Sequence, residues 1–186
     1  MLRLKSPANE RLFQSPVLEA TFGGGEANVA VSLSSFGESA AFVTALPDNP
    51  LGDAAVKELR RHAVDVSGIK RAAGRLGVYY LETGANQRPS SVVYDRDGSC
   101  ISKVRPGTFD WNGLLKGADW FHITGITPAL SREAADSALE AVRAARSAGV
   151  TVSIDLNYRK KLWNYGAAPA DVMRGLVAEA DVVIAN

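Results

Sequence analysis

Apolar residues recur at helical spacing in four segments of the chain, and the segments begin or end at residues typical of helix termini. The predicted helices are 25–36, 51–64, 131–148 and 169–178. In the first, Val29, Leu33 and Phe36 form one apolar side. Ser131 is a typical N-cap for the third helix, and Pro169 suits the first position of the fourth.

Between these helices lie short apolar runs of the kind that form buried strands, and one region of a different texture. The apolar runs are 39–46, 118–124, 150–156 and 181–186. Short β-branched and aromatic pieces, separated by turn residues, are typical of antiparallel strands; they occur at 77–83, 90–95 and 100–104. The alternation predicts an α/β fold: a mostly parallel sheet covered by helices on both faces, with a small antiparallel insertion.

Composition removes several classes of function. The 186 residues include 21 basic and 20 acidic side chains, a formal net charge of +1, so the balance does not favour nucleic acid or an anionic membrane as partner. Cys100 stands alone, which excludes an intrachain disulfide and any multi-cysteine metal site. The first residues lack the apolar core of a signal peptide, and no window has the ~18 apolar residues of a membrane span. We therefore expect a cytoplasmic protein.

The stretch TFGGGEANVAVSL places three glycines before the first predicted helix. Gly23 and Gly25 match two positions of the dinucleotide motif G-x-G-x-x-G, but the third position is Asn28, and no clean buried strand precedes the loop. A close-packed turn without a ligand is the simplest alternative. In a third interpretation, backbone N–H groups and Asn28 bind the hydroxyls of a polyol.

The strongest local signal is SIDLNYRKKLW, where Asn157, Tyr158 and Arg159 follow a predicted buried strand. Ligands of parallel sheets collect beyond the carboxyl ends of the strands, so these side chains are candidates for a site. Asp155 falls inside the apolar strand, where a carboxylate needs a partner. Arg159 could clamp an anion, or it could form an ordinary surface ion pair.

In the antiparallel insertion, Tyr94 and Arg96 are two residues apart, so both project from one face if the segment is a strand. Tyr79 lies in the earlier strand of the same insertion. A phenol beside a guanidinium suits a small carboxylated polyol, although aromatic residues in such strands also serve for cross-strand packing.

Together these stretches resemble one family, the ribokinase-like (PfkB) carbohydrate kinases, and within it the 2-keto-3-deoxygluconate kinases. The resemblance rests on GGGEANVAVSLSSFG, TALPDNPLGD, GVYYLE, VVYDRDGS, HITGITPALS and DLNYRKKLW, in this order along essentially the whole chain. It implies a ribokinase-like fold in which approximately 1–22 and 77–105 form a β lid and 23–76 and 106–186 form the α/β core.

The resemblance also implies roles for individual residues. Those implied to bind the substrate are Gly24, Gly25, Asn28, Tyr79, Tyr94, Arg96, Ile126 and Arg159. Arg159 would in addition stabilise charge on the transferred phosphoryl group. The implied neighbours of the nucleotide are Asn157, Tyr158, Arg159 and Asn186. The cofactors would be ATP and Mg²⁺, and intact relatives pair through their lids into homo-oligomers.

The implied reaction is ATP-dependent phosphorylation of 2-keto-3-deoxygluconate to its 6-phosphate. A tyrosine and an arginine in the lid favour a sugar acid over neutral fructose, because a carboxylate needs charge-assisted donors. The family's catalytic aspartate lies in a Gly-Ala-Gly-Asp motif, which the 186 residues do not contain. We therefore expect the substrate-and-lid portion of a kinase, with the C-terminal part of the fold absent and no activity of its own.

Three alternatives stay open at this point. One is a fructokinase or another PfkB sugar kinase, since fructokinases share the Gly-Gly-Asn opening. Another is a catalytically silent sugar-binding protein, and a more distant one is a nucleotide-dependent oxidoreductase. The residues do not distinguish ketodeoxygluconate from ketodeoxygalactonate, because the two differ at one stereocentre and would meet the same side chains.

Overall fold

The structure is a computed structural model that describes residues 1–185, and the chain divides into two units, Met1–Cys100 and Ile101–Asn186. The strands of the first unit are β1 (Leu2–Lys5), β2 (Glu19–Phe22), β3 (Ala45–Pro47), β4 (Lys70–Ala72), β5 (Val78–Glu82) and β6 (Ser91–Asp95). Its helices are α1 (Gly25–Ser35) and α2 (Pro50–Arg61). The short 3₁₀ helix η1 (Cys100–Lys103) follows β6.

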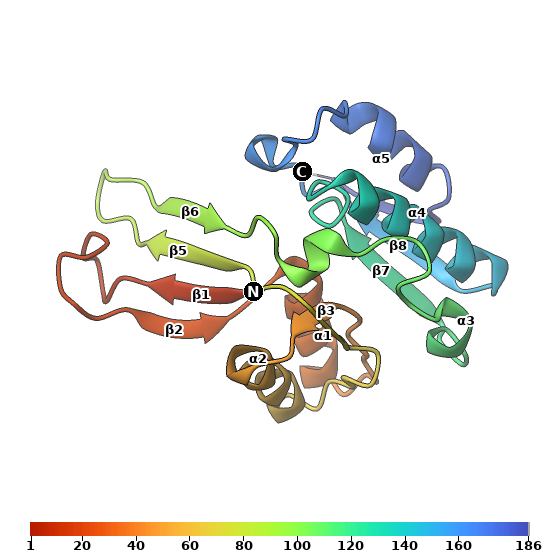
Figure 1. Ribbon diagram of the computed structural model, residues 1–186, viewed down its shortest axis with the longest axis horizontal. Helices are drawn as coiled ribbons and strands as arrows, with labels where there is room; N and C mark the ends of the chain where they lie inside the picture. Colours follow the sequence, from red (N-terminus) through yellow and green to blue (C-terminus); the bar gives the residue numbers. More distant parts are fainter. Residues whose placement is uncertain (186) are drawn as a thin grey trace. The chain divides into compact units, whose positions relative to one another are not determined.

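The first unit contains a four-stranded sheet in the order β2-β1-β5-β6, which projects away from α1 and α2 (Figure 1). The β1–β2 and β5–β6 pairs are antiparallel, whereas β1 and β5 are parallel. The expected antiparallel insertion is therefore a mixed sheet. The reason is topological: the chain between β1 and β5 passes through both helices, and such a long crossover allows parallel pairing.

Small apolar cores hold this unit together. Leu46, Val56 and Leu76 are buried, and Leu2 and Phe22 of the four-stranded sheet pack against them. A neighbouring cluster joins Ala30 of α1 to Leu59 of α2 and to Val64. Leu46 of β3 belongs to the first cluster, and Val66 and Ile69 pack against both clusters.

The prediction of the buried side of the first helix is wrong. Leu33 and Phe36 are 42% and 81% exposed, and the buried residue of α1 is Ala30. A helix that packs closely buries its small residues, because these allow the neighbouring backbone to approach. Gly37 follows the C-cap residue of the helix with a φ of +90°, a conformation that favours glycine.

The predictions for two strands also need correction. In the region of the expected strand 39–46, only β3 is a regular strand. Its partner β4 is equally short, so the ladder does not extend to Ala41, which forms an isolated bridge to Asp65. The expected strand 100–104 is the 3₁₀ helix η1. Before it, Ser99 forms only an isolated bridge to Arg75, so no strand ladder continues into this segment.

The second unit is a parallel α/β structure. Its helices are α3 (Trp111–Leu114), α4 (Arg132–Ser147), the 3₁₀ helix η2 (Lys160–Leu162) and α5 (Pro169–Val177), and its strands are β7 (Trp120–Thr124), β8 (Thr151–Asp155) and β9 (Val182–Ile184). The sheet order is β7-β8-β9, all parallel, as predicted from the alternation of strands and helices.

The apolar core of this unit lies between the sheet and its helices. Val152 and Ile154 of β8 are fully buried, as is Val142 of α4, and Leu176 of α5 is 1% exposed. The predicted cap is confirmed, since the Ser131 hydroxyl accepts a hydrogen bond from the Ala134 N–H at 3.0 Å. Figure 1 shows α4 and α5 packed beside the strands. No helix within the described residues is long and apolar enough to cross a membrane.

Candidate functional site

In the first unit, the four-stranded sheet brings two predicted site residues face to face. Tyr79 of β5 lies directly opposite Tyr94 of β6, and the two ring centroids are 6.1 Å apart. Gly77 and Arg96 continue this alternation on the same side, because a Cβ on Gly77 would lie 3.2 Å from the Cβ of Arg96. The structure therefore places two phenols and one guanidinium on one face of the sheet.

The glycine loop reaches the same end of this sheet. A Cβ on Gly23 would lie 3.3 Å from the Tyr79 hydroxyl and 3.8 Å from Oδ1 of Asn28. A Cβ at position 23 would therefore crowd the Tyr79 hydroxyl, whereas its distance to Asn28 would be an ordinary van der Waals contact. Asn28 is exposed in the first turns of α1, and its backbone N–H donates to the Gly24 carbonyl at 2.8 Å.

The start of α1 leaves backbone donors open. Gly24 is the N-cap residue and has no side chain to accept a hydrogen bond, so N–H groups of the first turn, beginning at Gly25, lack intrahelical acceptors. The preceding segment is β2, a largely exposed edge strand paired antiparallel with β1, which agrees with the expectation that no buried strand precedes the loop. A dinucleotide fold needs a buried parallel strand there, so this geometry does not support a dinucleotide site.

Arg96 is the most unusual charged residue of this face. It is only 9% exposed, and its Nε has no hydrogen-bond partner within the described residues. Burial lowers the pKa of the Arg96 guanidinium below its ordinary value, and the charge of Glu26 is the largest effect opposing that shift. A buried donor without an acceptor is costly, so the site suits a ligand that brings an oxygen to it.

The second unit places its predicted residues at the carboxyl ends of β7 and β8. Thr124 and Asp155 are partners in register at the last position of each strand. Gly125 then approaches β8 so closely that a Cβ on it would lie 2.1 Å from the Leu156 carbonyl oxygen, and its N–H donates to the Asp155 carbonyl at 2.8 Å. Ile126 follows directly, so this close contact fixes its position beside the end of β8.

Asp155 has the partner that its place in an apolar strand requires. Its carboxylate accepts a hydrogen bond from the Asn157 N–H at 3.0 Å, and Asn157 has a left-handed φ of +37°. This turn directs the chain away from the sheet toward Tyr158 and Arg159. Tyr158 is 55% exposed, and Arg159 is exposed with its Nη1 donating to the Tyr158 carbonyl at 3.0 Å. None of the ion pairs formed by the described residues involves Arg159.

The remaining predictions concern Asn186 and the metal ion. Asn186 lies outside the described residues. The described chain contains no group of three or more His, Cys, Asp or Glu side chains that could hold a metal ion. Binding of Mg²⁺, which proteins hold mostly through one or two carboxylates and substrate phosphates, stays a prediction.

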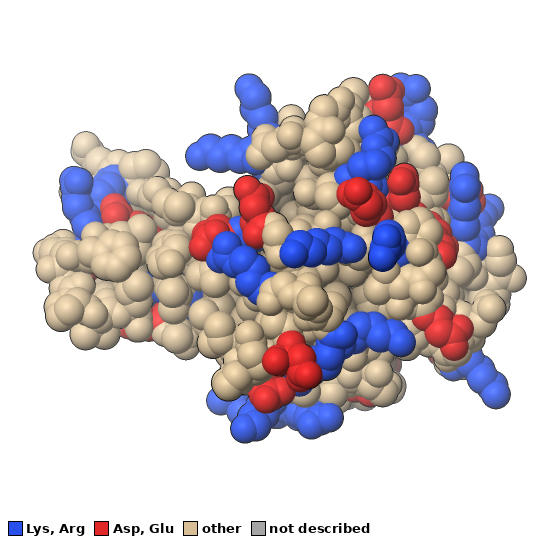
Figure 2. Space-filling model, viewed as in Figure 1, with Lys and Arg blue, Asp and Glu red and all other residues tan. Residues whose placement is uncertain are grey.

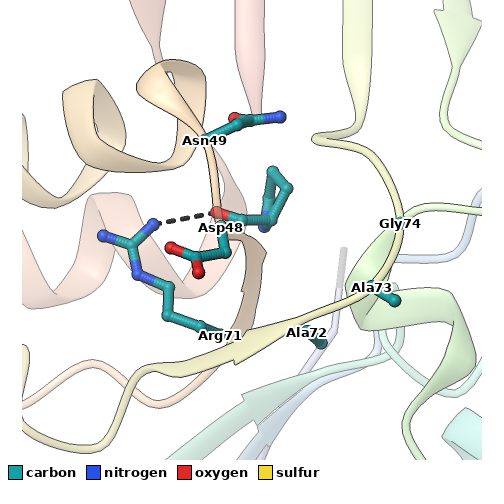
Figure 3. Close-up of a pocket in the computed structure, with 7 residues that line it drawn as sticks. Asp48, Asn49, Arg71, Ala72, Ala73 and Gly74 are labelled. Carbon is teal, nitrogen blue, oxygen red and sulfur yellow. Dashed lines mark hydrogen bonds between the residues drawn. The ribbon is translucent and has the colours of Figure 1, made fainter.

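An open hollow of about 410 Å³ occupies another part of the first unit and contains none of the predicted site residues. It is lined by Pro47, Asp48, Asn49, Arg71, Ala72, Ala73 and Gly74 (Figure 3). The cation that borders it already has partners: Arg71 donates to the Pro47 carbonyl at 2.9 Å and to Asp53 at 2.6 Å. On the face drawn in Figure 2, basic and acidic side chains are interspersed, consistent with the near-neutral balance of the sequence.

One residue of the sheet face and one residue of α1 were missed from the sequence. Arg3 lies beside Tyr79 in register and donates to the Thr21 hydroxyl at 2.8 Å, so it shares the face of Tyr79 and Tyr94. Glu26 stands in the first turn of α1, next to the predicted Gly25. Period-two alternation in the first strand could have indicated Arg3, whereas no local pattern relates Glu26 to the sheet.

Comparisons with known proteins place this arrangement in a family. Residues 3–186 match the pfkB family carbohydrate kinase. A 2-dehydro-3-deoxygalactonokinase of Haloferax volcanii is 39% identical over 185 residues, which cover 100% of this chain and 58% of that protein. The crystal structure of a 2-dehydro-3-deoxygluconokinase from Thermotoga maritima is 48% identical, with a TM-score of 0.95 over 100% of this chain and 57% of that one.

A fructokinase from Xylella fastidiosa with bound ATP is a more distant structural relative, 25% identical, with a TM-score of 0.86 over 98% of this chain and 57% of that one. The chain thus spans a little over half the length of these relatives. Because the family match extends over nearly all 186 residues, the chain belongs to the pfkB family of carbohydrate kinases.

Proposed function

We propose that this chain carries the sugar-binding part of an ATP-dependent kinase for 2-keto-3-deoxy sugar acids, with 2-keto-3-deoxygluconate as the preferred substrate. The observation that supports this most is Arg96, whose buried guanidinium retains an Nε–H without an acceptor beside Tyr79 and Tyr94. A carboxylate supplies two acceptor oxygens and a compensating charge, which a neutral hexose lacks. The relatives whose names specify a 2-dehydro-3-deoxy sugar acid agree with this choice.

In this proposal the residues of the first unit select the sugar acid. Arg96 binds its carboxylate, and the hydroxyls of Tyr79 and Tyr94 donate to its oxygens. The backbone N–H groups at Gly24 and Gly25 and the side chain of Asn28 bind its hydroxyl groups. Several such donors fixed on a sheet and a helix hold the ligand with little loss of conformational freedom.

In the second unit, Ile126 provides an apolar contact to the substrate, and Arg159 provides positive charge for the transferred phosphoryl group. Asn157 and Tyr158 border the nucleotide, together with Asn186. The terminal hydroxyl oxygen of the sugar acid attacks the γ-phosphorus, the bond to ADP breaks, and the hydroxyl proton passes to a base. Negative charge spreads over the phosphoryl oxygens, so a mobile guanidinium lowers the barrier.

None of the residues to which this proposal gives a role serves as the base for this step. The resemblance assigns it to the aspartate of a Gly-Ala-Gly-Asp motif, which the 186 residues lack. Phosphorylation is therefore proposed for the complete kinase that contains this chain. Use of ATP, as in the fructokinase relative solved with it, also favours a cytoplasmic location.

We further propose that the complete kinase forms a homo-oligomer through the four-stranded sheet. Val93 alternates with Tyr94 and so projects from the opposite face, where it is 52% exposed. Phe13 is 71% exposed, and its ring lies 6.4 Å from that of Tyr80 on the same face. Exposed apolar side chains of this kind favour contact with another copy. Sedimentation of Val93→Lys beside the wild type tests this, since an unchanged oligomer would contradict it.

A substrate panel tests the main proposal. The complete kinase is assayed by ADP release with ketodeoxygluconate, ketodeoxygalactonate and fructose. One charge-assisted contact contributes about 1.5–3 kcal/mol, so kcat/KM for the preferred sugar acid should exceed that for fructose by about 10–100-fold. Equal or better use of fructose would overturn the proposal in favour of a fructokinase. ATP hydrolysis that no sugar stimulates, with sugar-acid binding retained, would indicate a silent sugar-binding protein.

A further inference from the structure

One row of side chains crosses all four strands of the β2-β1-β5-β6 sheet. Arg3 of β1 pairs in register with Thr21 of β2 on one side and with Tyr79 of β5 on the other. Tyr79 in turn pairs with Tyr94 of β6. Residues that pair in register project from the same side of a sheet. Arg3 therefore lies in the middle of the face that carries both tyrosines, and the proposed function gives it no role.

A hydrogen bond orients Arg3 on this face. Its guanidinium donates through Nε to the Thr21 hydroxyl at 2.8 Å. Thr21 is the only hydrogen-bond partner of this guanidinium among the residues that the structure describes, and none of their ion pairs involves Arg3. A guanidinium presents five N–H donors in a planar fork. The bond to Thr21 therefore uses one donor of Arg3 and leaves both Nη groups for another acceptor.

The cations of this face differ in how their donors are used. Lys5 lies two residues beyond Arg3 on the same side of β1, and it forms an ion pair with Glu19 at 3.2 Å. Arg3 has no such acidic partner within the described chain, and Arg96 retains an Nε–H without an acceptor there. Two guanidiniums with unused donors thus belong to the strands on either side of β5, so the face is suited to an anionic ligand.

The spacing of the sheet allows Arg3 and Arg96 to serve one small ligand. Neighbouring strands lie about 4.8 Å apart and two residues of a strand span about 6.6 Å, so two strand spacings and two residues separate the Cα atoms by roughly 12 Å. Two arginine side chains that project from the same side of a sheet can meet across this distance. A carboxylate has about four lone-pair positions, so it can accept hydrogen bonds from both guanidiniums.

We propose that Arg3 is a second specificity-determining residue, which binds the carboxylate of the sugar acid together with Arg96. This inference rests on the proposed function, because it adds one more donor to the same acid-binding face. Thr21 acts as a positioning residue that orients Arg3 before the ligand arrives, so less conformational freedom is lost on binding. A neutral sugar gains little from Arg3, because it brings no opposite charge to the guanidinium.

The test measures KM and kcat of the complete kinase for ketodeoxygluconate and for fructose. Arg3→Ala should raise KM for the sugar acid about tenfold and leave KM for fructose and kcat within about twofold, because a binding contact to the carboxylate is lost. Lys5→Ala is the matched control. It removes a cation of the same strand and face that Glu19 already neutralises, so both KM values should stay within about twofold.

Three results of this test would overturn the proposal: an unchanged KM for the acid in Arg3→Ala, an equal rise for fructose, and an equal rise in Lys5→Ala. The wild type separates this inference from the proposed function. If the wild type prefers fructose, the proposed function fails and the inference fails with it. If the wild type prefers the sugar acid and Arg3→Ala keeps that preference, the inference alone fails, and Arg96 remains the residue that selects the acid.

Arg3→Gln keeps the experiment decisive if Arg3→Ala fails to fold, since glutamine retains a donor and much of the side chain without the charge. It should also raise KM for the acid and spare fructose, and a wild-type KM for the acid would contradict a role for the charge of Arg3.

Thr21→Val tests the positioning role, because it removes the acceptor of the Arg3 Nε–H and keeps the shape of the side chain. It should raise KM for the acid about threefold in the wild type and should have no further effect in an Arg3→Ala background. The positioning role is refuted by an effect that persists without Arg3, or by no effect in either background.

Discussion

Two of the arginines assigned to the ligands lie in opposite surroundings. Arg96 belongs to the first unit and is 9% exposed. Burial lowers the pKa of its guanidinium, and the charge of Glu26 opposes that shift. Arg159 is exposed in the second unit, beyond the end of β8, where it donates to the carbonyl of the preceding residue. One cation is thus fixed by packing before any ligand arrives, and the other keeps much of its rotamer freedom.

This difference in exposure suits the two arginine side chains to two different tasks. A buried guanidinium has already lost its conformational entropy during folding, so it can discriminate between ligands at little further loss. An exposed guanidinium costs nothing in desolvation and can follow charge that moves during a reaction. Selection of the sugar acid therefore suits Arg96, and stabilisation of a transferred phosphoryl group suits Arg159.

The largest expected effect is on stability, and it tests whether the second unit owes its rigidity to the core of β8. Ile154 is fully buried, whereas Leu51, the second residue of α2, is 48% exposed. Ile154→Ala should lower the free energy of unfolding by about 2–5 kcal/mol, because it leaves a cavity. Leu51→Ala should change it by less than about 1 kcal/mol. Urea titrations measure both, and comparable losses would contradict the assignment of the core.

Next in size is the effect of the exposed cation on the reaction. Arg159→Ala in the complete kinase should lower kcat by about 10²–10³-fold and change KM for the sugar acid little, since its charge acts mainly in the transition state. Lys160→Ala, the neighbouring exposed cation, is the control and should leave kcat unchanged. If Arg159→Ala instead raised KM alone, both arginines would serve in binding and the contrast between them would disappear.

The buried cation should show the reverse division between kinetic parameters. Arg96→Ala should raise KM for the sugar acid by about 10–100-fold and spare neutral sugars, because one charge-assisted contact is lost. Arg11→Ala, an exposed arginine between β1 and β2, serves as the control. Steady-state kinetics with a sugar acid and with fructose give the comparison. An unchanged KM for the acid would remove Arg96 from the site.

The smallest expected effect is that of the ion pair between Arg75 and Asp95 in the first unit, whose side chains are both half-exposed. Arg75 donates to Asp95 at 2.5 Å and 2.6 Å and holds the pKa of that carboxyl below its ordinary value. Because the folded-state pKa lies below the unfolded one, the pair stabilises the fold at neutral pH. That contribution is lost as the pH falls below about 4.

As the pH is lowered into the acid range, the free energy of unfolding of Asp95→Asn should therefore fall slightly less steeply than that of the wild type. The effect stays small because both side chains are more than 40% exposed to solvent. Urea midpoints measured at neutral and acid pH provide the test. Identical profiles for Asp95→Asn and the wild type would show that solvent screens the pair completely.

Local features of the fold could be predicted because their causes are local. Ser131 caps α4, Pro169 opens α5 and Gly149 follows α4 with a φ of +74°, each for a reason contained within a few residues. The failures share another cause. The segment 100–104 has strand-forming residues, yet its burial at Cys100 and Val104 comes from packing that no window of sequence contains.

The sequence by itself determined the alternation of β7, α4, β8, α5 and β9, the family, and the presence of Asn157, Tyr158 and Arg159 directly after a buried strand, since periodicity and motif order are properties of the chain alone. Only the tertiary structure decided that β1 pairs in parallel with β5, which places Arg3 beside Tyr79. It also decided that Arg96 is buried and that burial lowers the pKa of its guanidinium, because burial depends on the packing of residues that are remote in sequence.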